Sequence, residues 1–159
     1  GMCAQFSPMF LGKRLEGLWH TNVVVYGREY YFGGGIMSNM VGCTRWGLPL
    51  KVHTIGTTQV PIELFEMFLE ELRPRYSMES YDVLDNNCNS FSQEACEFLT
   101  GNSLPSYIPE MVQEIRNSPL AASLLPFVRN MQHQITGNVM DGQMRGMQQG
   151  GMGGGMGSQ

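Results

Sequence analysis

Cys88 is the residue in this chain best placed to act as a nucleophile. The residues 85–87 are Asp-Asn-Asn, which can cap a helix, and a helix is predicted from about Cys88 to Leu99. In its first turn, unpaired backbone N–H groups would favour a thiolate and could stabilise an oxyanion. The alternative is a small core residue, because Cys88 also lies on the apolar stripe of Phe91 and Ala95. The spacing alone favours neither interpretation.

A cysteine nucleophile works best with an imidazole, and the sequence has three histidines. His20 lies near the start of the most apolar strand candidate, residues 18–26, where a buried imidazole must be hydrogen-bonded. His53 is predicted on the surface of another strand, and His133 lies at the edge of a low-complexity segment. His20 is therefore the candidate base, with a satisfied core histidine as the alternative.

Polar and aromatic residues near this pair are candidates for its support. Asn87 and Asn89 flank the thiol with amides that could assist the backbone N–H of the nucleophile in holding an oxyanion. Strand periodicity places Asn22 on the same face as the histidine, so it is the candidate third group. Trp19 and Tyr26, from the same strand candidate, are predicted to line the substrate cleft.

The elements that must position these residues predict an α+β fold. β-branched and aromatic residues indicate strands, and apolar residues at helical spacing indicate helices. A hairpin turn is expected at Gly27-Arg28, and the glycine run at 33–35 is expected to end the second strand. The predicted strands are residues 18–26, 29–32, 50–55 and 81–84, and the predicted helices are residues 61–73, 88–99, 109–116 and 120–131.

Length and composition set the limits of the domain. The 159 residues carry a net charge of −4 without a basic block, so nucleic-acid binding has little support. The folded domain is expected to span residues 1–133, because residues 134–159 are mostly Gly, Met, Gln and Ser and are predicted to be a disordered tail. No apolar run is long enough to span a bilayer.

The four cysteines do not form paired clusters with zinc-ligand spacing. The start of the chain lacks the charged and apolar regions of a secretory signal, so we expect reduced thiols in the cytoplasm or the nucleus. Neither a metal nor another cofactor is expected.

Several blocks of the sequence, in their order and spacing, resemble the PPPDE peptidase family, which includes the deSUMOylating isopeptidases called DeSI. Each block alone is short, but together they extend over roughly residues 1–130. The blocks are residues 17–21 (GLWHT), 29–36 (EYYFGGGI), 87–92 (NCNSFS), 99–101 (LTG) and 104–105 (LP).

The resemblance implies a circularly permuted papain-like fold, with a small antiparallel sheet packed against helices. It also implies a catalytic dyad of His20 and Cys88, which occupy the family's W-H-T and N-C-N blocks. The implied activity is removal of SUMO or another ubiquitin-like modifier from proteins without a metal, in the cytoplasm or nucleus, by a chain that can form homodimers. Family members usually have one further strand just before the position of Gly1. This chain is either truncated there or completes its sheet another way, and a missing strand would expose a sheet edge.

Two other functions remain open at this point. The same dyad could hydrolyse a protein S-acyl thioester such as a palmitoyl group, which needs an apolar pocket rather than a narrow groove. Alternatively, the domain could bind a modifier or a partner protein without catalysis, in which case Cys88 would have ordinary thiol reactivity.

Overall fold

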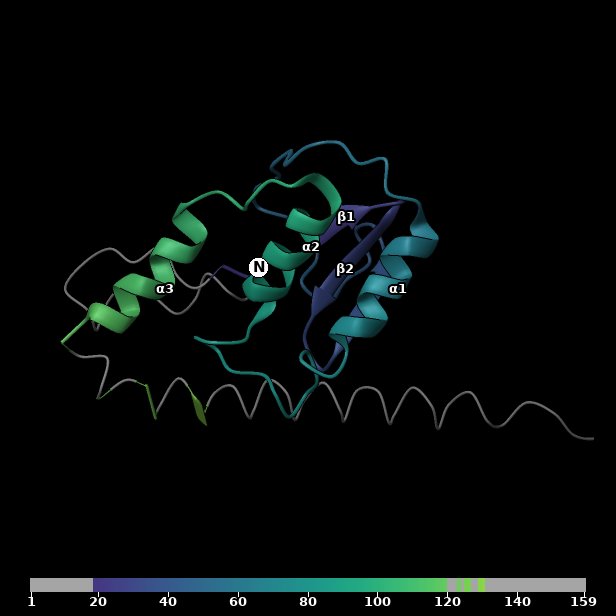
Figure 1. Ribbon diagram of the computed structural model, residues 1–159. Helices are drawn as coiled ribbons and strands as arrows, with labels where there is room; N and C mark the ends of the chain where they lie inside the picture. Colours follow the sequence, from purple (N-terminus) through teal and green to yellow (C-terminus); the bar gives the residue numbers. More distant parts are fainter. Residues whose placement is uncertain (1–18, 120–122, 124, 127–128, 131–159) are drawn as a thin grey trace, which may run out of the picture.

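The described residues form a three-stranded antiparallel sheet with three helices beside it, which confirms the predicted α+β class (Figure 1). The computed structural model describes residues 19–119, 123, 125–126 and 129–130. The sheet order is β1-β2-β3. The strands are β1 (Val23–Val25), β2 (Arg28–Phe32) and β3 (Ile36–Met40), and the helices are α1 (Ile62–Leu72), α2 (Cys88–Thr100) and α3 (Tyr107–Asn117).

The first hairpin turns one residue earlier than expected. Val25 pairs with Arg28, so the two-residue loop is Tyr26-Gly27 rather than Gly27-Arg28. Both loop residues have positive φ, 52° at Tyr26 and 72° at Gly27. Positive φ at both positions is the geometry that matches the right-handed twist of paired strands. The predicted role of Gly27 is therefore confirmed, while the predicted position of the turn is wrong.

The third strand is residues 36–40, not the predicted 50–55. The glycine run ends β2 at Phe32, as predicted, and turns the chain back into β3, with the Gly33 N–H donating to Gly35 O at 3.1 Å and Gly35 at φ 123°. Residues 50–55 have no regular structure, and Leu50 and Val52 are 69% and 80% exposed. Strand propensity without a neighbouring strand is insufficient to form a sheet.

The other predicted strand, residues 81–84, is also wrong. It is reduced to a single bridge between Asp82 and Asn86, which closes the loop before α2.

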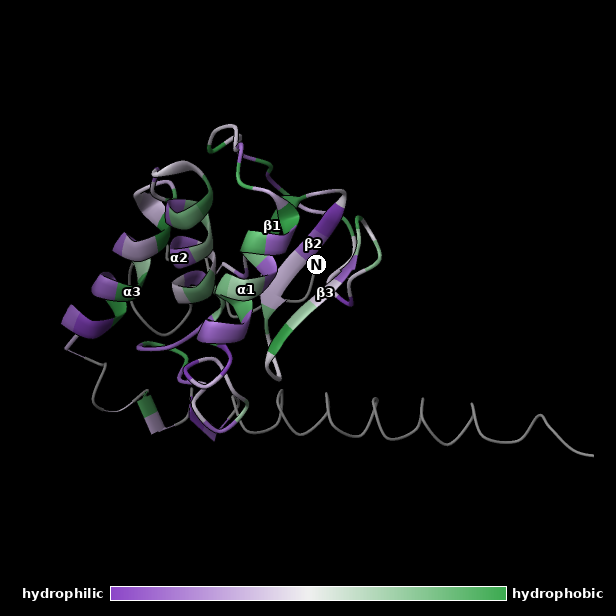
Figure 2. Cartoon of the chain, turned by 45° about the vertical axis from the view of Figure 1, so that its right-hand side comes forward, coloured by the Kyte–Doolittle hydropathy of each residue, from purple (hydrophilic) through white to green (hydrophobic). Residues whose placement is uncertain are grey.

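The two faces of β2 are both covered. On one face, the Tyr30 ring packs edge to face on Phe65 of α1, with centroids 5.1 Å apart, and Phe32 packs against Tyr76 and Tyr81. Tyr31 points to the opposite face, where it packs against Trp46 at 4.9 Å. Figure 2 shows hydrophobic residues along β1 and a hydrophilic start to β2. Glu29, the polar residue of β2 that shares a face with Tyr31, is therefore buried as well.

Helix α2 begins at Cys88, as predicted, because Asn87 caps it. The Asn87 side chain accepts hydrogen bonds from the backbone N–H groups of Asn89 (2.9 Å) and Ser90 (3.1 Å), and the Ser90 hydroxyl accepts from the Asn87 backbone N–H at 3.1 Å. This reciprocal capping box stops the helix from beginning elsewhere. The helix ends at Gly101, whose φ of 74° only glycine adopts without strain. The position of the thiol is thus set by local sequence.

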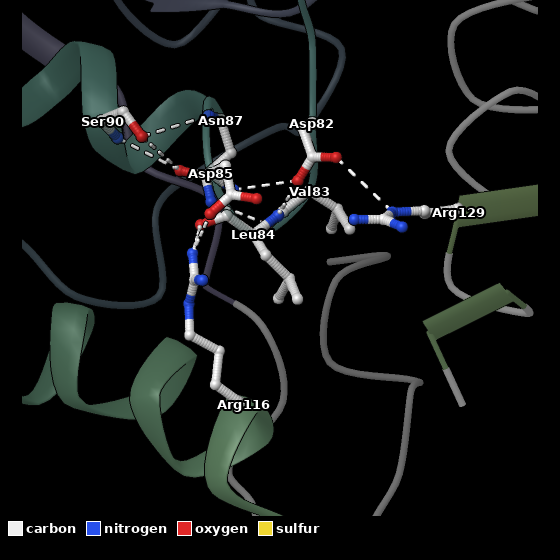
Figure 3. A network of polar contacts seen from close by, with 8 residues as sticks. All are labelled: Asp82, Val83, Leu84, Asp85, Asn87, Ser90, Arg116 and Arg129. Carbon is white, nitrogen blue, oxygen red and sulfur yellow. Dashed lines mark hydrogen bonds and ion pairs between the residues drawn. The ribbon is translucent and has the colours of Figure 1, made fainter. Parts of the chain in front are cut away.

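The loop that leads into Cys88 is held by arginines from the C-terminal part of the chain (Figure 3). Arg116 of α3 donates to Leu84 O at 3.1 Å and pairs with Asp85. Burial would raise the pKa of Asp82, but backbone N–H groups of Leu84 and Asp85, together with Arg129 and Arg116, lower it instead. The loop is therefore held both by hydrogen bonds within it and by two arginines from later in the chain.

The remaining helix predictions agree with the structure where it describes them. Helix α1 lies within the predicted 61–73, with Pro61 and Arg73 as its caps, and α3 includes the predicted 109–116. No helix in the described part of the chain is long and apolar enough to cross a membrane. His133, Cys3, the predicted tail at 134–159 and much of the predicted helix at 120–131 lie outside the described residues.

The capping box gives a testable prediction. Asn87→Ala removes the Oδ1 acceptor of both cap hydrogen bonds and the 2.7 Å bond from Asn87 Nδ2 to Val83 O, and should destabilise the fold by about 1–2 kcal/mol in urea unfolding. Asn87→Asp keeps a cap acceptor and should lose less. Equal losses in the two variants would contradict a capping role.

Candidate active site

His20 is enclosed between aromatic rings. Its imidazole stacks on Trp46 with ring centroids 3.6 Å apart and an interplanar angle of 16°. Tyr31 meets it edge-on at 6.2 Å. The ring nitrogen Nε2 lies 2.6 Å from Asn22 Oδ1. These contacts fix the plane of the imidazole and occupy one of its two nitrogens.

The same enclosure decides the charge of the imidazole. Burial lowers the pKa of His20 from 6.5 to about 4; the hydrogen bond to Asn22 opposes this shift, and the nearby positive charge of Arg45 adds to it. His20 is consequently neutral at physiological pH, in the state in which an imidazole can accept a proton.

Asn89 connects the chain around His20 to the start of α2. Its Nδ2 donates to Trp19 O at 3.0 Å, and its Oδ1 accepts from the Thr21 hydroxyl at 2.8 Å. Both neighbours of His20 in the chain therefore bind the same amide. The Cys88 sulfur also contacts this amide, with Sγ 3.9 Å from Asn89 Oδ1. The buried thiol, 6% exposed, and the backbone on either side of the imidazole thus meet around one side chain.

The flanking asparagines support the site through contacts of their own. The Asn87 side chain caps α2 and donates to Val83 O, while both polar atoms of the Asn89 side chain bind the segment around His20. Their predicted oxyanion role stays a prediction. The contacts that the structure provides are positional.

A cavity of about 520 Å³ lies beside His20. Trp19, predicted for the substrate cleft, lines it, whereas neither Tyr26 nor Cys88 is among its lining residues. Tyr26 instead packs 5.8 Å from Phe65 in the core. Much of the wall is apolar, with side chains that include Val23, Ile55, Leu99, Leu104 and Ile108. Such a volume is within the range of small-molecule pockets.

Other thiols differ from Cys88 in their surroundings. Cys96, eight residues further along α2, is buried, and burial followed by the charge of Glu97 raises its pKa. Cys43 is an exposed free thiol.

His53 is exposed, with Nε2 2.8 Å from the Tyr107 hydroxyl. The described residues contain no cluster of three or more His, Cys, Asp or Glu side chains that could hold a metal ion.

Trp46 and Glu29 belong to the site but were not predicted. Trp46 comes from a segment without periodicity, so the sequence contains no signal for its stacking on His20. The sequence does contain a signal for the burial of Glu29. Three aromatic residues in succession, 30–32, indicate a strand covered on both faces, so the adjacent residue on this strand is expected to be buried too.

The lowered pKa of His20 predicts acid sensitivity. Between pH 6.5 and about 4 the unfolded chain binds a proton at this residue and the folded chain does not, so stability falls as the pH falls. From pH 7 to 4.5, His20 should contribute about 2–3 kcal/mol of this loss. Urea unfolding should therefore show a smaller pH dependence in His20→Gln than in the unmodified chain, while His53→Gln should keep it. An unchanged pH dependence in His20→Gln would contradict the burial.

Comparison with known proteins assigns the chain to a family. The model of the “PPPDE putative peptidase domain” matches residues 1–128. Desumoylating isopeptidase 1 of Xenopus laevis is 42% identical over 139 residues, covering 86% of this chain and 82% of that protein. The protein of the same name from Homo sapiens is 39% identical over 148 residues, covering 92% and 88%. The chain therefore belongs to the PPPDE peptidase family and is a peptidase-type hydrolase.

Proposed function

We propose that this chain is a cysteine isopeptidase in which Cys88 is the nucleophile and His20 is the general base. The observation that carries the proposal is the Asn89 amide, which binds Trp19 O and the Thr21 hydroxyl and contacts the Cys88 sulfur. A neutral imidazole and a thiol at a helix start are the groups that thiol hydrolysis requires.

In the first step, His20 accepts the thiol proton as Sγ attacks the carbonyl carbon of the isopeptide bond. The oxygen becomes an oxyanion, for which we propose the backbone N–H of Cys88 as a donor. The imidazolium then protonates the leaving lysine amine, and the C–N bond breaks. In the second step, His20 takes a proton from water as the water oxygen attacks the thioester carbonyl. The C–S bond then breaks, which releases the carboxylic acid, and the imidazolium returns its proton to the departing sulfur to restore the thiol.

Burial of His20 affects these proton transfers. An imidazole whose pKa is about 4 in the resting site holds a proton poorly, so it passes the proton readily to an amine. It is also a weaker base toward the thiol. The oxyanion that forms close to the new imidazolium, and the helix start, offset this weakness as the reaction proceeds.

The proposed substrate is a protein that carries SUMO or another ubiquitin-like modifier, as the names of the relatives say for those proteins. We propose the circularly permuted papain-like arrangement for the fold, because the histidine precedes the cysteine in the chain. A cytoplasmic or nuclear location and a homodimer remain predictions.

One observation favours a second candidate substrate, a protein S-acyl thioester. The cavity beside His20 has an apolar wall, and Leu48, Leu50 and Val52 near it are 79%, 69% and 80% exposed. An acyl chain could be buried there at a gain of about 0.8 kcal/mol per methylene. The chemistry would be unchanged, since a thioester and an isopeptide bond are attacked at the same kind of carbonyl.

Labelling by a modifier with an electrophilic C-terminus tests the nucleophile. A SUMO probe should modify the chain at Cys88 at neutral pH, Cys88→Ser should abolish the labelling, and His20→Ala should slow it on the order of 100-fold or more. The measurement is the second-order labelling rate by intact mass. Cys43→Ser, which removes an exposed thiol, should label like the unmodified chain.

The same set of variants separates the alternatives. Hydrolysis of an acyl-thioester substrate that depends on Cys88, without SUMO labelling, would favour the thioesterase. A folded chain that binds SUMO but reacts with neither probe would leave the non-catalytic binding module as the explanation.

A further inference from the structure

Glu29 is a buried carboxylate that the proposed reaction does not use. It lies on β2, is 5% exposed, and shares the face of Tyr31. One oxygen, Oε2, accepts the backbone N–H of Gly42 at 2.9 Å. The other, Oε1, lies 3.5 Å from Asn22 Nδ2, the outer limit for a hydrogen bond. Burying a charged carboxylate costs free energy unless it is hydrogen-bonded, so Glu29 needs these two contacts. The contacts in turn restrict the orientation of the groups that make them.

The carboxylate decides which way the Asn22 amide faces. A carboxylate can only accept hydrogen bonds, so the amide must direct Nδ2 toward Glu29. The reverse orientation would place Oδ1 against a negatively charged oxygen. The amide oxygen is thereby left facing His20, at 2.6 Å from Nε2.

The amide orientation in turn decides the tautomer of His20. Oδ1 of Asn22 can only accept, so Nε2 of the neutral imidazole must carry the proton and donate it. The unprotonated nitrogen is then Nδ1. Only this nitrogen can accept a proton from a thiol.

We infer that Glu29 is a positioning residue, which acts through Asn22 to keep His20 in the Nε2–H tautomer with Nδ1 free to act as the base. The inference rests on the proposed function for its catalytic consequence, but the tautomer itself is a property of the resting protein. A merely structural role would be different: through Gly42, Glu29 would hold the segment that carries Trp46, with no effect on the proton of His20.

Glu29→Gln separates the two roles. The introduced side chain has one acceptor oxygen, which the Gly42 N–H takes, so its amide N–H₂ faces Asn22 and turns the Asn22 amide around. Asn22 then donates to Nε2 of His20, and the proton moves to Nδ1. We expect ¹⁵N NMR of the imidazole at pH 7 to show the Nδ1–H form, and the rate of SUMO-probe labelling to fall on the order of 100-fold.

A second substitution should reverse this effect. When Asn22→Asp is combined with Glu29→Gln, the new carboxylate can accept both from the new amide and from His20, so the Nε2–H form should return. Labelling should recover to within several-fold of the unmodified chain. Glu71→Gln, which neutralises an exposed carboxylate on α1, is the control for charge and should change neither the tautomer nor the rate.

The outcomes are decisive in each direction. An unchanged Nε2–H tautomer in folded Glu29→Gln would overturn the inference, even if labelling were lost. A switched tautomer that the double variant restores supports it, and does so even if the unmodified chain reacts with no probe, in which case the proposed function alone fails. Should Glu29→Gln not fold, the double variant decides: an Nδ1–H form there would overturn the inference.

Discussion

The side chain of Asn89 is the contact on which the arrangement of the site depends. It joins segments nearly seventy positions apart in the chain, with one amide group donating to Trp19 O and accepting from Thr21. Its own position follows from the capping box, since its backbone N–H binds Asn87 Oδ1. A helix start defined by local sequence is thereby held at a fixed distance from the segment that precedes β1. Truncating this side chain would leave Trp19 O without its partner, which is why we expect geometry, not only stability, to depend on it.

Enclosure of His20 keeps its imidazole neutral. The Trp46 ring and the surrounding side chains remove the imidazole from water and lower its pKa to about 4. A neutral imidazole avoids the free-energy cost of burying a charge. Tyr31 comes from β2, whereas Trp46 comes from an irregular segment, whose position depends on contacts such as that between Gly42 and Glu29.

Local signals predicted much of this molecule, and non-local contacts account for what they missed. The start of α2 at Cys88 and its end at Gly101 follow from capping residues that act within a few positions. Strand β3 was missed because Ile36–Met40 is not strongly apolar and owes its conformation to pairing with β2. Residues 50–55 have the composition of a strand but pair with no strand in the part of the chain that the structure describes. Trp46 reaches His20 only through the tertiary fold, whereas the burial of Glu29 follows from the aromatic run at 30–32, which indicates a strand covered on both faces.

The residue type at position 22 follows from its two neighbours. It must accept from Nε2 of His20 and approach Oε1 of Glu29, so it needs an acceptor on one side and a donor on the other. An aspartate would accept from the histidine but would set two buried carboxylates against each other, and its charge would raise the pKa of His20. A serine or threonine has a single proton and a shorter reach. An amide satisfies both neighbours without adding charge, so the buried Glu29 and the neutral His20 together explain why asparagine stands between them.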